Sequence, residues 1–458
     1  MSSRTQPAPP EPDAAFARPT RAERLAIASF ILIALAYGAV VEMRSAWLGV
    51  RMTDLDVYLR AAWAVRTGHD LYSIADDRGW HYHYPPLFAI ALIPLADAPR
   101  GQSRAGMMPF GAAVAVWYLL NLALLGFAVN TLASALERRL CGHTDGIPPP
   151  GCRAWWMLRL LPILIFIAPI GVALERGQAD LLLLALLCAM VAAVIAGRSL
   201  IAGLWLSAAI CIKLFPAYLL IYALWRRDFR LIAGCGLGLI VGLIMIPAAY
   251  FGPARAVAYA REWNHVLIEP ALLGGSDRSR AGELLDINGT DSQSFVALLH
   301  RWYNLSETVS LPRRLRSRPL ERWATPAHWA IAALLTVLTL PAARWDRRKS
   351  ALGEELFLSC LAVIMLLSSP VSHLHYFTLA VPLAMGLVVA GRSGAAVYPR
   401  RNWSWLFAAV SLSGMLPLLP GLEALRDLGL AAIGALALCG TGIIVLARSV
   451  HPQTLIDV

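Results

Sequence analysis

Charged residues are scarce in this chain. Of its 458 residues, 15% are charged and 58% are hydrophobic, and the mean hydropathy is +0.59, whereas a soluble domain usually has about 25% charged residues. This shortage, with the many apolar runs, excludes an ordinary soluble domain and predicts a polytopic membrane protein. The net charge of +11 does not indicate a nucleic-acid partner, because the arginines lie in short clusters between apolar segments, as the positive-inside bias places them.

Cysteine spacings typical of metal sites or disulfide frameworks are also absent. Cys141 and Cys152 flank a proline-rich loop without a C-x-x-C spacing, and the other five cysteines lie in apolar segments, where cysteine behaves as a small hydrophobic residue. We therefore assign no metal, no cofactor and no disulfide. No internal repeat of fixed period is visible, which argues mildly against an inverted-repeat transporter.

The apolar runs predict an all-α fold with about ten to twelve transmembrane helices. We expect a basic cytoplasmic leader over residues 1–24, a single transmembrane domain over 25–450, and a short tail over 451–458. The larger outer loops should be residues 43–85 and 252–325. The topology between residues 86 and 200 stays open, because the basic segment 137–153 is typical of a cytoplasmic loop, whereas counting every span places it outside.

The first outer loop carries the most distinctive residues. Asp54 and Asp56 follow the first apolar segment closely, and several aromatic residues and a Pro85-Pro86 pair come after them. Ionisable groups near the hydrocarbon core are costly and often functional, so our hypothesis is a catalytic loop with Asp54 as the base. An aspartate that merely caps a helix explains the residue equally well.

The Asp54-Leu55-Asp56 tripeptide resembles a metal-binding D-x-D motif, since two carboxylates can share a divalent cation. At the start of a helix, however, residues i and i+2 lie on different faces. We therefore favour one catalytic base over a metal-binding pair.

Four further polar residues interrupt apolar segments. Lys213 lies within an apolar run, where an unpaired ammonium costs about 2.5–3.5 kcal/mol on insertion scales. It could face a lipid phosphate or an internal acid, or it could snorkel to the interface. Gln178 lies in a polar break that could bind a sugar or form a plain turn. His375 could donate to a phosphate or be an interfacial histidine, and Gln293 precedes a helix that Ser294 could cap.

These residues belong to six short motifs that occur in order. The motifs are Asp54-Leu55-Asp56-Val57-Tyr58, Gly68-His69-Asp70-Leu71-Tyr72, Tyr84-Pro85-Pro86-Leu87, Gly177-Gln178, Lys213-Leu214-Phe215-Pro216, and Ser369-Pro370-Val371-Ser372-His373-Leu374-His375-Tyr376. Together they resemble glycosyltransferase family 87, the polyprenol-phosphate-mannose-dependent mannosyltransferases of the integral-membrane GT-C type. The chain departs from the family pattern at Asp180, which often is Asn, and at His373 and Tyr376, which replace Trp and the second His.

The resemblance implies an inverting transfer of a hexosyl group, mannosyl in the family, from a polyprenyl-phosphate sugar to a glycolipid or glycan acceptor. The protein would be a multi-pass protein of the bacterial inner membrane with its active site on the extracytoplasmic face, and it would use no nucleotide and no metal. Asp54 would take the proton of the acceptor hydroxyl, and Lys213 and His375 would hold the donor phosphate. The residues expected to bind the sugar or the acceptor are Asp56, Tyr58, Tyr72, Tyr84, Gln178 and Gln293.

Two other classes remain open from the residues alone. A secondary transporter or lipid flippase is supported by the helix count and by the buried Lys213. A metal-dependent oligosaccharyltransferase would use Asp54 and Asp56 with a divalent ion, and chelator sensitivity would distinguish it.

Overall fold

The structure, a computed structural model, describes residues 17–50, 52–140, 148–269, 292–304, 320–343, 350–392 and 400–449. In these ranges the chain is helical, without strands and with one isolated bridge between Ala75 and His81. The predicted all-α fold class is confirmed. Most of the predicted leader, the tail 451–458 and the parts 270–291 and 305–319 of the second outer loop lie outside the described residues.

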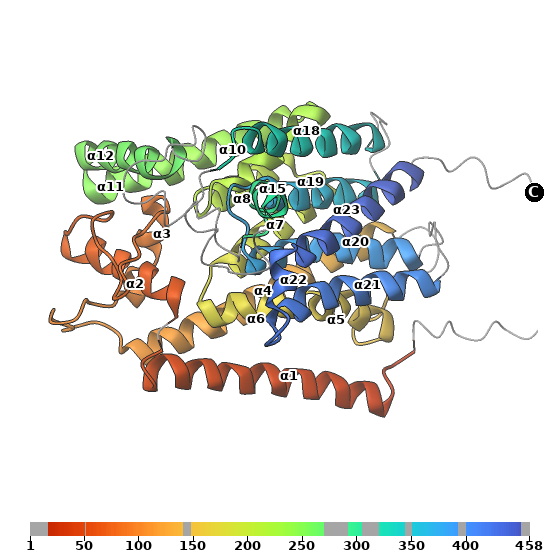
Figure 1. The fold of residues 1–458 in the computed structure, drawn as a ribbon, viewed down its shortest axis with the longest axis horizontal. Coiled ribbons are helices and arrows are strands. Elements are labelled where there is room, and N and C mark those ends of the chain that lie inside the picture. The colour runs from red at the N-terminus through yellow and green to blue at the C-terminus, as the bar shows by residue number, and fades with distance from the viewer. Residues whose placement is uncertain are drawn as a thin grey trace, which may run out of the picture.

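The long helices run roughly along the long axis of the molecule, and α2, α3, α11 and α12 gather at one end, on the left in Figure 1. Helices directed away from this end are α4 (Phe110–Leu140), α7 (Asp180–Ile195), α9 (Leu220–Arg226), α18 (Ala324–Ala342), α20 (Val381–Arg392) and α23 (Leu430–Ser449). Helices directed toward it are α1 (Arg21–Glu42), α5 (Arg153–Ile165), α6 (Ile167–Arg176), α8 (Ser199–Ile210), α10 (Phe229–Leu239), α11 (Ile246–Phe251), α19 (Ala351–Ser368) and α21 (Arg400–Met415).

Further helical segments connect the helices named above. The α-helices among them are α2 (Thr53–Thr67), α3 (Pro86–Ala91), α12 (Pro253–Trp263), α15 (Phe295–Tyr303) and α22 (Glu423–Asp427). The 3₁₀ and π segments are η1 (Met43–Trp47), η2 (Ile93–Leu95), η4 (Phe215–Leu219), η5 (Ile240–Met245), η6 (Asn264–Ile268), η7 (Leu374–Ala380) and η8 (Leu416–Leu418).

Within the described residues, seven helical segments are long and apolar enough to cross a membrane. The pair α5 and α6, bent by 67°, would make an eighth span, and Pro162 near the end of α5 explains the bend. Helices α7 and α8 are apolar but shorter. The described residues thus contain seven candidate spans, or eight with the bent pair, and the protein is a multi-pass membrane protein.

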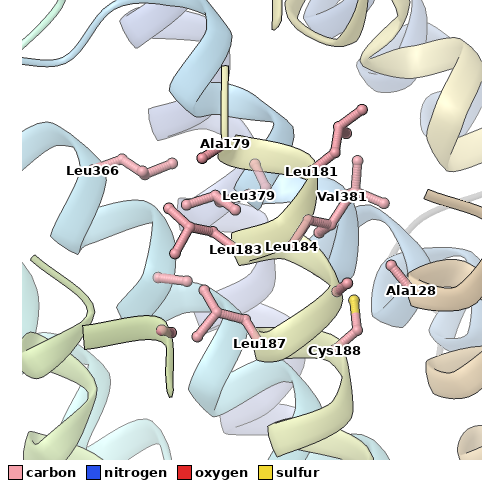
Figure 2. Packing of buried hydrophobic residues seen from close by; sticks show 14 of the residues in the cluster. Ala128, Ala179, Leu181, Leu183, Leu184, Leu187, Cys188, Leu366, Leu379 and Val381 are labelled. Carbon is pink, nitrogen blue, oxygen red and sulfur yellow. The ribbon is translucent and has the colours of Figure 1, made fainter. Parts of the chain in front are cut away.

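Helix α7 lies in the centre of the bundle. Its sequence is apolar on every side, which is typical of a helix that is buried all round. Figure 2 shows Leu183, Leu184 and Leu187 of this helix among side chains of other elements, including Leu366 of α19 and Val381 of α20. Because α7 and α19 are both buried along nearly their whole length, they form a rigid support for the polar residues at their ends.

The first loop is held in place by a buried arginine. Arg60 on α2 is 1% exposed, and its guanidinium donates to the carbonyl of Asp97 (3.2 Å) and pairs with the carboxylates of Asp77 (3.2 Å) and Asp97 (3.4 Å). This pairing ties three segments of the loop together and fixes the direction of α2.

The structure resolves the open topology between residues 86 and 200. Helix α3 is only six residues long and is followed by the 3₁₀ turn η2, so this apolar stretch does not cross the bundle. Helix α4 therefore begins at the end that holds α2. The described parts of the basic segment, residues 137–140 and 148–153, lie at the opposite end, where Arg392 of α20 donates to the carbonyl of Ala154.

Candidate active site

Asp54 lies at the start of α2 and faces the end of α6. The Nε of Arg176, the last residue of α6, donates to Asp54 Oδ2 at 2.8 Å, and the two side chains are 34% and 22% exposed. Gly177 then ends α6 in the left-handed conformation that glycine adopts without strain. The first-loop carboxylate is thus paired with an arginine 122 residues away in the sequence.

Burial raises the pKa of the Asp54 carboxyl, but the charges of Arg176, His375 and Lys213 lower it more. The pKa of Asp54 therefore lies below its usual value, and the carboxylate is ionised at neutral pH. An ionised carboxylate is the form that a general base requires.

A second, buried cluster is centred on Asp180 at the start of α7. Lys213 Nζ, in the break between α8 and η4, donates to Asp180 Oδ1 at 2.7 Å, and Nδ1 of His375 on η7 is bonded to Asp180 Oδ2. Since a carboxylate only accepts hydrogen bonds, the His375 Nδ1 carries a hydrogen. The other ring nitrogen, Nε2, is thereby fixed in direction and has no hydrogen-bond partner within the described residues.

Three tyrosines and a glutamine join the two clusters. The Tyr58 hydroxyl donates to Gln178 Oε1 at 2.9 Å and lies 3.1 Å from the Tyr84 hydroxyl. Lys213 Nζ also donates to Gln178 Oε1, at 3.2 Å. Tyr72 supports this layer from behind, because its hydroxyl donates to the Tyr84 carbonyl at 3.0 Å and its side chain is fully buried.

A cavity of about 130 Å³ opens beside these clusters. Its polar lining residues are Arg176, Gln293, His373, His375 and Arg426. Its apolar lining residues are Val172, Leu374, Pro417, Leu418 and Ala431. A cavity lined by both cations and apolar side chains suits an anion that carries an apolar tail.

Two buried polar atoms in this wall have no hydrogen-bond partner in the described part of the chain, Nε2 of His375 and Oε1 of Gln293. Gln293 is held firmly, because its backbone N–H donates to the Ser372 carbonyl at 2.6 Å and its Nε2 donates to the Arg426 carbonyl at 2.9 Å. Buried polar atoms normally have partners. We therefore expect a polar ligand to complete this wall.

The structure brings most of the predicted site residues together, though with different surroundings than expected. Tyr58, Tyr84, Gln178 and Lys213 form one hydrogen-bonded polar layer. Asp54 lies close enough for the charge of Lys213 to lower its pKa, and His375 and Gln293 line the cavity itself. Tyr72 lies behind the layer. Asp56 is 2% exposed and, among the described residues, is not part of the cavity wall.

Three further charged residues belong to the site although the motifs did not single them out as site residues: Arg176, Asp180 and Arg426. Lys213 is not part of the cavity wall in the described residues; it is 4% exposed and paired with Asp180. Arg176 and Arg426 provide the cations of the cavity wall, and the phosphate contact of Lys213 stays a prediction. A signal for Asp180 was present in the sequence, because a buried lysine needs an acidic partner.

No group of three or more His, Cys, Asp and Glu side chains converges on a metal-sized site within the described ranges. Asp54 and Asp56 face different surroundings, because Asp54 contacts Arg176 at the cavity and Asp56 is buried. The two acids of the D-x-D tripeptide therefore do not form a joint cation site in this geometry.

The family model described as glycosyltransferase family 87 matches residues 82–370, well over half of the chain. The chain belongs to glycosyltransferase family 87. The resemblance seen in the motifs is confirmed, and the protein is a membrane glycosyltransferase and not a transporter or flippase. The family 87 segment contains Arg176, Asp180, Lys213 and Gln293, whereas Asp54 precedes it and Arg426 follows it.

Two curated relatives of this family 87 chain are mycobacterial. A polyprenol-phosphate-mannose-dependent alpha-(1-2)-phosphatidylinositol pentamannoside mannosyltransferase of Mycobacterium tuberculosis is 25% identical over 86% of this chain and 78% of its own length. A polyprenol-phosphate-mannose-dependent alpha-(1-2)-phosphatidylinositol mannoside mannosyltransferase of Mycolicibacterium smegmatis is 26% identical over 81% and 77%. Among solved structures, ArnT from Cupriavidus metallidurans bound to undecaprenyl phosphate aligns with 92% of this chain and 78% of its own, at 16% identity and a TM-score of 0.39.

Proposed function

We propose that the protein transfers a mannosyl group from a polyprenyl-phosphate mannose to a lipid-anchored glycan, with inversion at the sugar carbon. The observation that carries the proposal is the cavity beside the ionised Asp54, which is lined by two arginines together with apolar residues. The names of both curated relatives state the same donor and acceptors of the phosphatidylinositol mannoside class.

In the proposed reaction, Asp54 accepts the proton of the acceptor hydroxyl. The acceptor oxygen forms a bond to the anomeric carbon, and the bond between that carbon and the phosphate oxygen breaks. The lipid phosphate leaves as a monoester with one more negative charge than the diester. Preorganised cations aimed at such developing charge are worth most where water is excluded, and Arg176, His375 and Arg426 are placed to act on it.

Gln293 and the Tyr58–Gln178 pair would orient the sugar. The Oε1 of Gln293 can accept from a sugar hydroxyl, because no described residue donates to it. Asp180 and Lys213 would hold the His375 ring in its orientation and would not touch the substrate. The fixed ring then presents Nε2 to the phosphate or to a sugar hydroxyl.

We place the site on the extracytoplasmic face. Nine arginines lie in short turns and at helix ends at the far end of the bundle, where the positive-inside bias counts them: Arg138, Arg139, Arg153, Arg198, Arg226, Arg227, Arg230, Arg392 and Arg448. At the site end, the short turns 177–179 and 369–373 carry none, and helix ends carry Arg44, Arg176 and Arg426. This asymmetry supports a cytoplasmic far end and an outward-facing site.

The donor class can be tested with the full-length protein in lipid nanodiscs that contain a phosphatidylinositol mannoside acceptor. Polyprenyl-phosphate [³H]mannose should give labelled glycolipid without added metal and in the presence of a chelator, whereas GDP-mannose should give none. Transfer from GDP-mannose, or transfer that a chelator abolishes, would refute the proposal.

A further inference from the structure

The ion pair with Arg176 engages one oxygen of the Asp54 carboxylate, the proposed base of the reaction. Asp54 Oδ2 accepts from Arg176 Nε at 2.8 Å and from the Thr53 hydroxyl at 3.1 Å. A carboxylate oxygen that is bonded to a guanidinium is a weak proton acceptor. Asp54 in this arrangement is ionised but not ready to take a proton from a neutral hydroxyl.

The same guanidinium lies in the wall of the cavity. Arg176 lines it from α6, and Arg426 lines it from α22. Helix α22 is anchored to α15, because Arg301 Nε donates to the Asp427 carbonyl at 2.9 Å and Trp302 Nε1 donates to the Leu428 carbonyl at 3.1 Å. A phosphate between the two arginines would compete with Asp54 for Arg176, since guanidinium binds phosphate through paired hydrogen bonds.

The other cations near Asp54 are held elsewhere. Lys213 and His375 act on the Asp54 carboxylate at longer range, and both are bonded to Asp180. The tyrosines that face the carboxylate from α2, the first loop and η7 are Tyr58, Tyr84 and Tyr376, and none of them is a cation. Of the described groups around Asp54, Arg176 is the one that combines a direct bond to it with a place in the cavity wall.

We propose that Arg176 is a donor-dependent positioning residue: it holds Asp54 while the cavity is empty and moves to the donor phosphate when the donor binds, which frees Asp54 to act as the base. The inference rests on the proposed function and adds its regulation. It predicts that the donor binds before the acceptor can react, because Asp54 becomes a competent base only after the phosphate has taken Arg176.

The charge balance of the reaction fits this exchange. The donor phosphate carries one negative charge and the product phosphate two, while Asp54 becomes neutral when it accepts the proton. Arg176 is therefore attracted more strongly to the phosphate as the bond to the sugar breaks and has no reason to return to the protonated Asp54. After Asp54 releases its proton to water and the lipid phosphate leaves, the ion pair can form again.

The test is the affinity of the full-length protein for polyprenyl monophosphate in nanodiscs. Binding costs the ion pair in the wild type, so removing the pair in Asp54→Asn should tighten binding about two- to fivefold, the value of a partly exposed ion pair. A purely structural role of the pair predicts the reverse, because its loss would disorder the site. Equal or weaker binding by Asp54→Asn overturns the proposal.

Two further variants complete the cycle. Adding Arg176→Gln to Asp54→Asn should abolish the gain in affinity and weaken binding below that of the wild type. Adding Arg176→Lys to Asp54→Asn should keep part of the gain in affinity. Arg44→Gln is the matched control, because Arg44 pairs with the exposed Glu175 near the same end and is not in the cavity wall; its affinity should equal that of the wild type. If neither the wild type nor any variant binds polyprenyl phosphate, the proposed function itself fails. Equal binding by the wild type and Asp54→Asn is a different outcome, because it overturns only the role of Arg176.

Discussion

The two ends of the bundle each contain an arginine–carboxylate pair, and the two pairs differ in their burial and in what surrounds them. At the far end, the guanidinium of Arg159 on α5 donates two hydrogen bonds, of 2.7 and 3.0 Å, to the Glu137 carboxylate on α4. The two side chains are 5% and 8% exposed. Its remaining hydrogen bonds go to Asn130, Ser134 and the Trp155 carbonyl. At the site end, Arg176 Nε donates to Asp54 Oδ2 at the wall of a cavity, and the side chains are 34% and 22% exposed.

This difference shows how one chemical pairing serves two purposes. A buried, two-bond pair cannot exchange partners without leaving charges unpaired in a dry interior, so it fixes the position of two helices. A partly exposed pair at the wall of a cavity costs little to separate. It can therefore release its carboxylate when another anion arrives.

The largest effect should come from breaking the far-end pair. Arg159→Met leaves the Glu137 carboxylate buried without its partner, which should destabilise the fold by about 3–5 kcal/mol. Thermal unfolding in detergent measures the loss. The double variant Arg159→Met, Glu137→Leu should recover most of the stability, because a pair replaced by apolar residues is often neutral.

The transfer rate per folded molecule should stay unchanged in both far-end variants. If instead the specific activity fell while the unfolding temperature stayed constant, the pair would belong to the catalytic machinery, and the contrast between the two ends would be wrong.

A smaller effect should follow from Asp180→Asn at the site end. The amide keeps the shape of the side chain but loses the charge that holds Lys213 and His375, and hydrogen bonds to charged groups contribute about 1.5–3 kcal/mol. We expect kcat/KM for transfer to fall roughly 10- to 100-fold. Asp228→Asn, at the cap of α10 at the far end, is the control and should leave transfer unaffected; similar losses in both variants would argue for a general effect on folding.

The smallest effect is a shift in pH dependence. The folded-state pKa of Asp54 is depressed, so the stability that its ion pair provides is present at neutral pH and is lost only as the pH falls through the depressed value. In Arg176→Gln, burial still raises the pKa of Asp54 but the largest lowering charge is gone. The acid limb of kcat/KM for the donor, which reports the enzyme before the donor binds, should therefore move to higher pH.

This shift can be measured from about pH 4 to pH 8, a range that brackets the ordinary aspartate pKa. Arg44→Gln should keep the wild-type profile. An Arg176→Gln enzyme whose profile has the wild-type shape at a lower rate would mean that Arg176 does not control the ionisation of Asp54.

Much of the fold could be predicted from the sequence, because a membrane requires long apolar runs for the spanning helices and favours basic residues in the cytoplasmic turns. The topology before residue 200 could not, since only the structure shows that α3 turns back after six residues. A short apolar run has the same composition whether it crosses a membrane or ends within it.

The site could be predicted in part. Asp54 and Lys213 were recognisable because charges beside or inside apolar segments are costly. Arg176 looked like part of a plain turn, and its contact with Asp54 joins segments far apart in the chain. Arg426 lies in a short helix whose position is set by α15, which no local pattern reveals. The roles of these residues in the reaction are still predictions.

The central claim is that Asp54 is the base, and the most direct measurement is kcat for transfer from saturating polyprenyl-phosphate mannose in Asp54→Asn. We predict a fall of about 10²- to 10⁴-fold in a protein that still binds polyprenyl phosphate, and a smaller fall in Asp56→Asn. A rate for Asp54→Asn within about tenfold of the wild type, or a greater loss in Asp56→Asn, would contradict the claim.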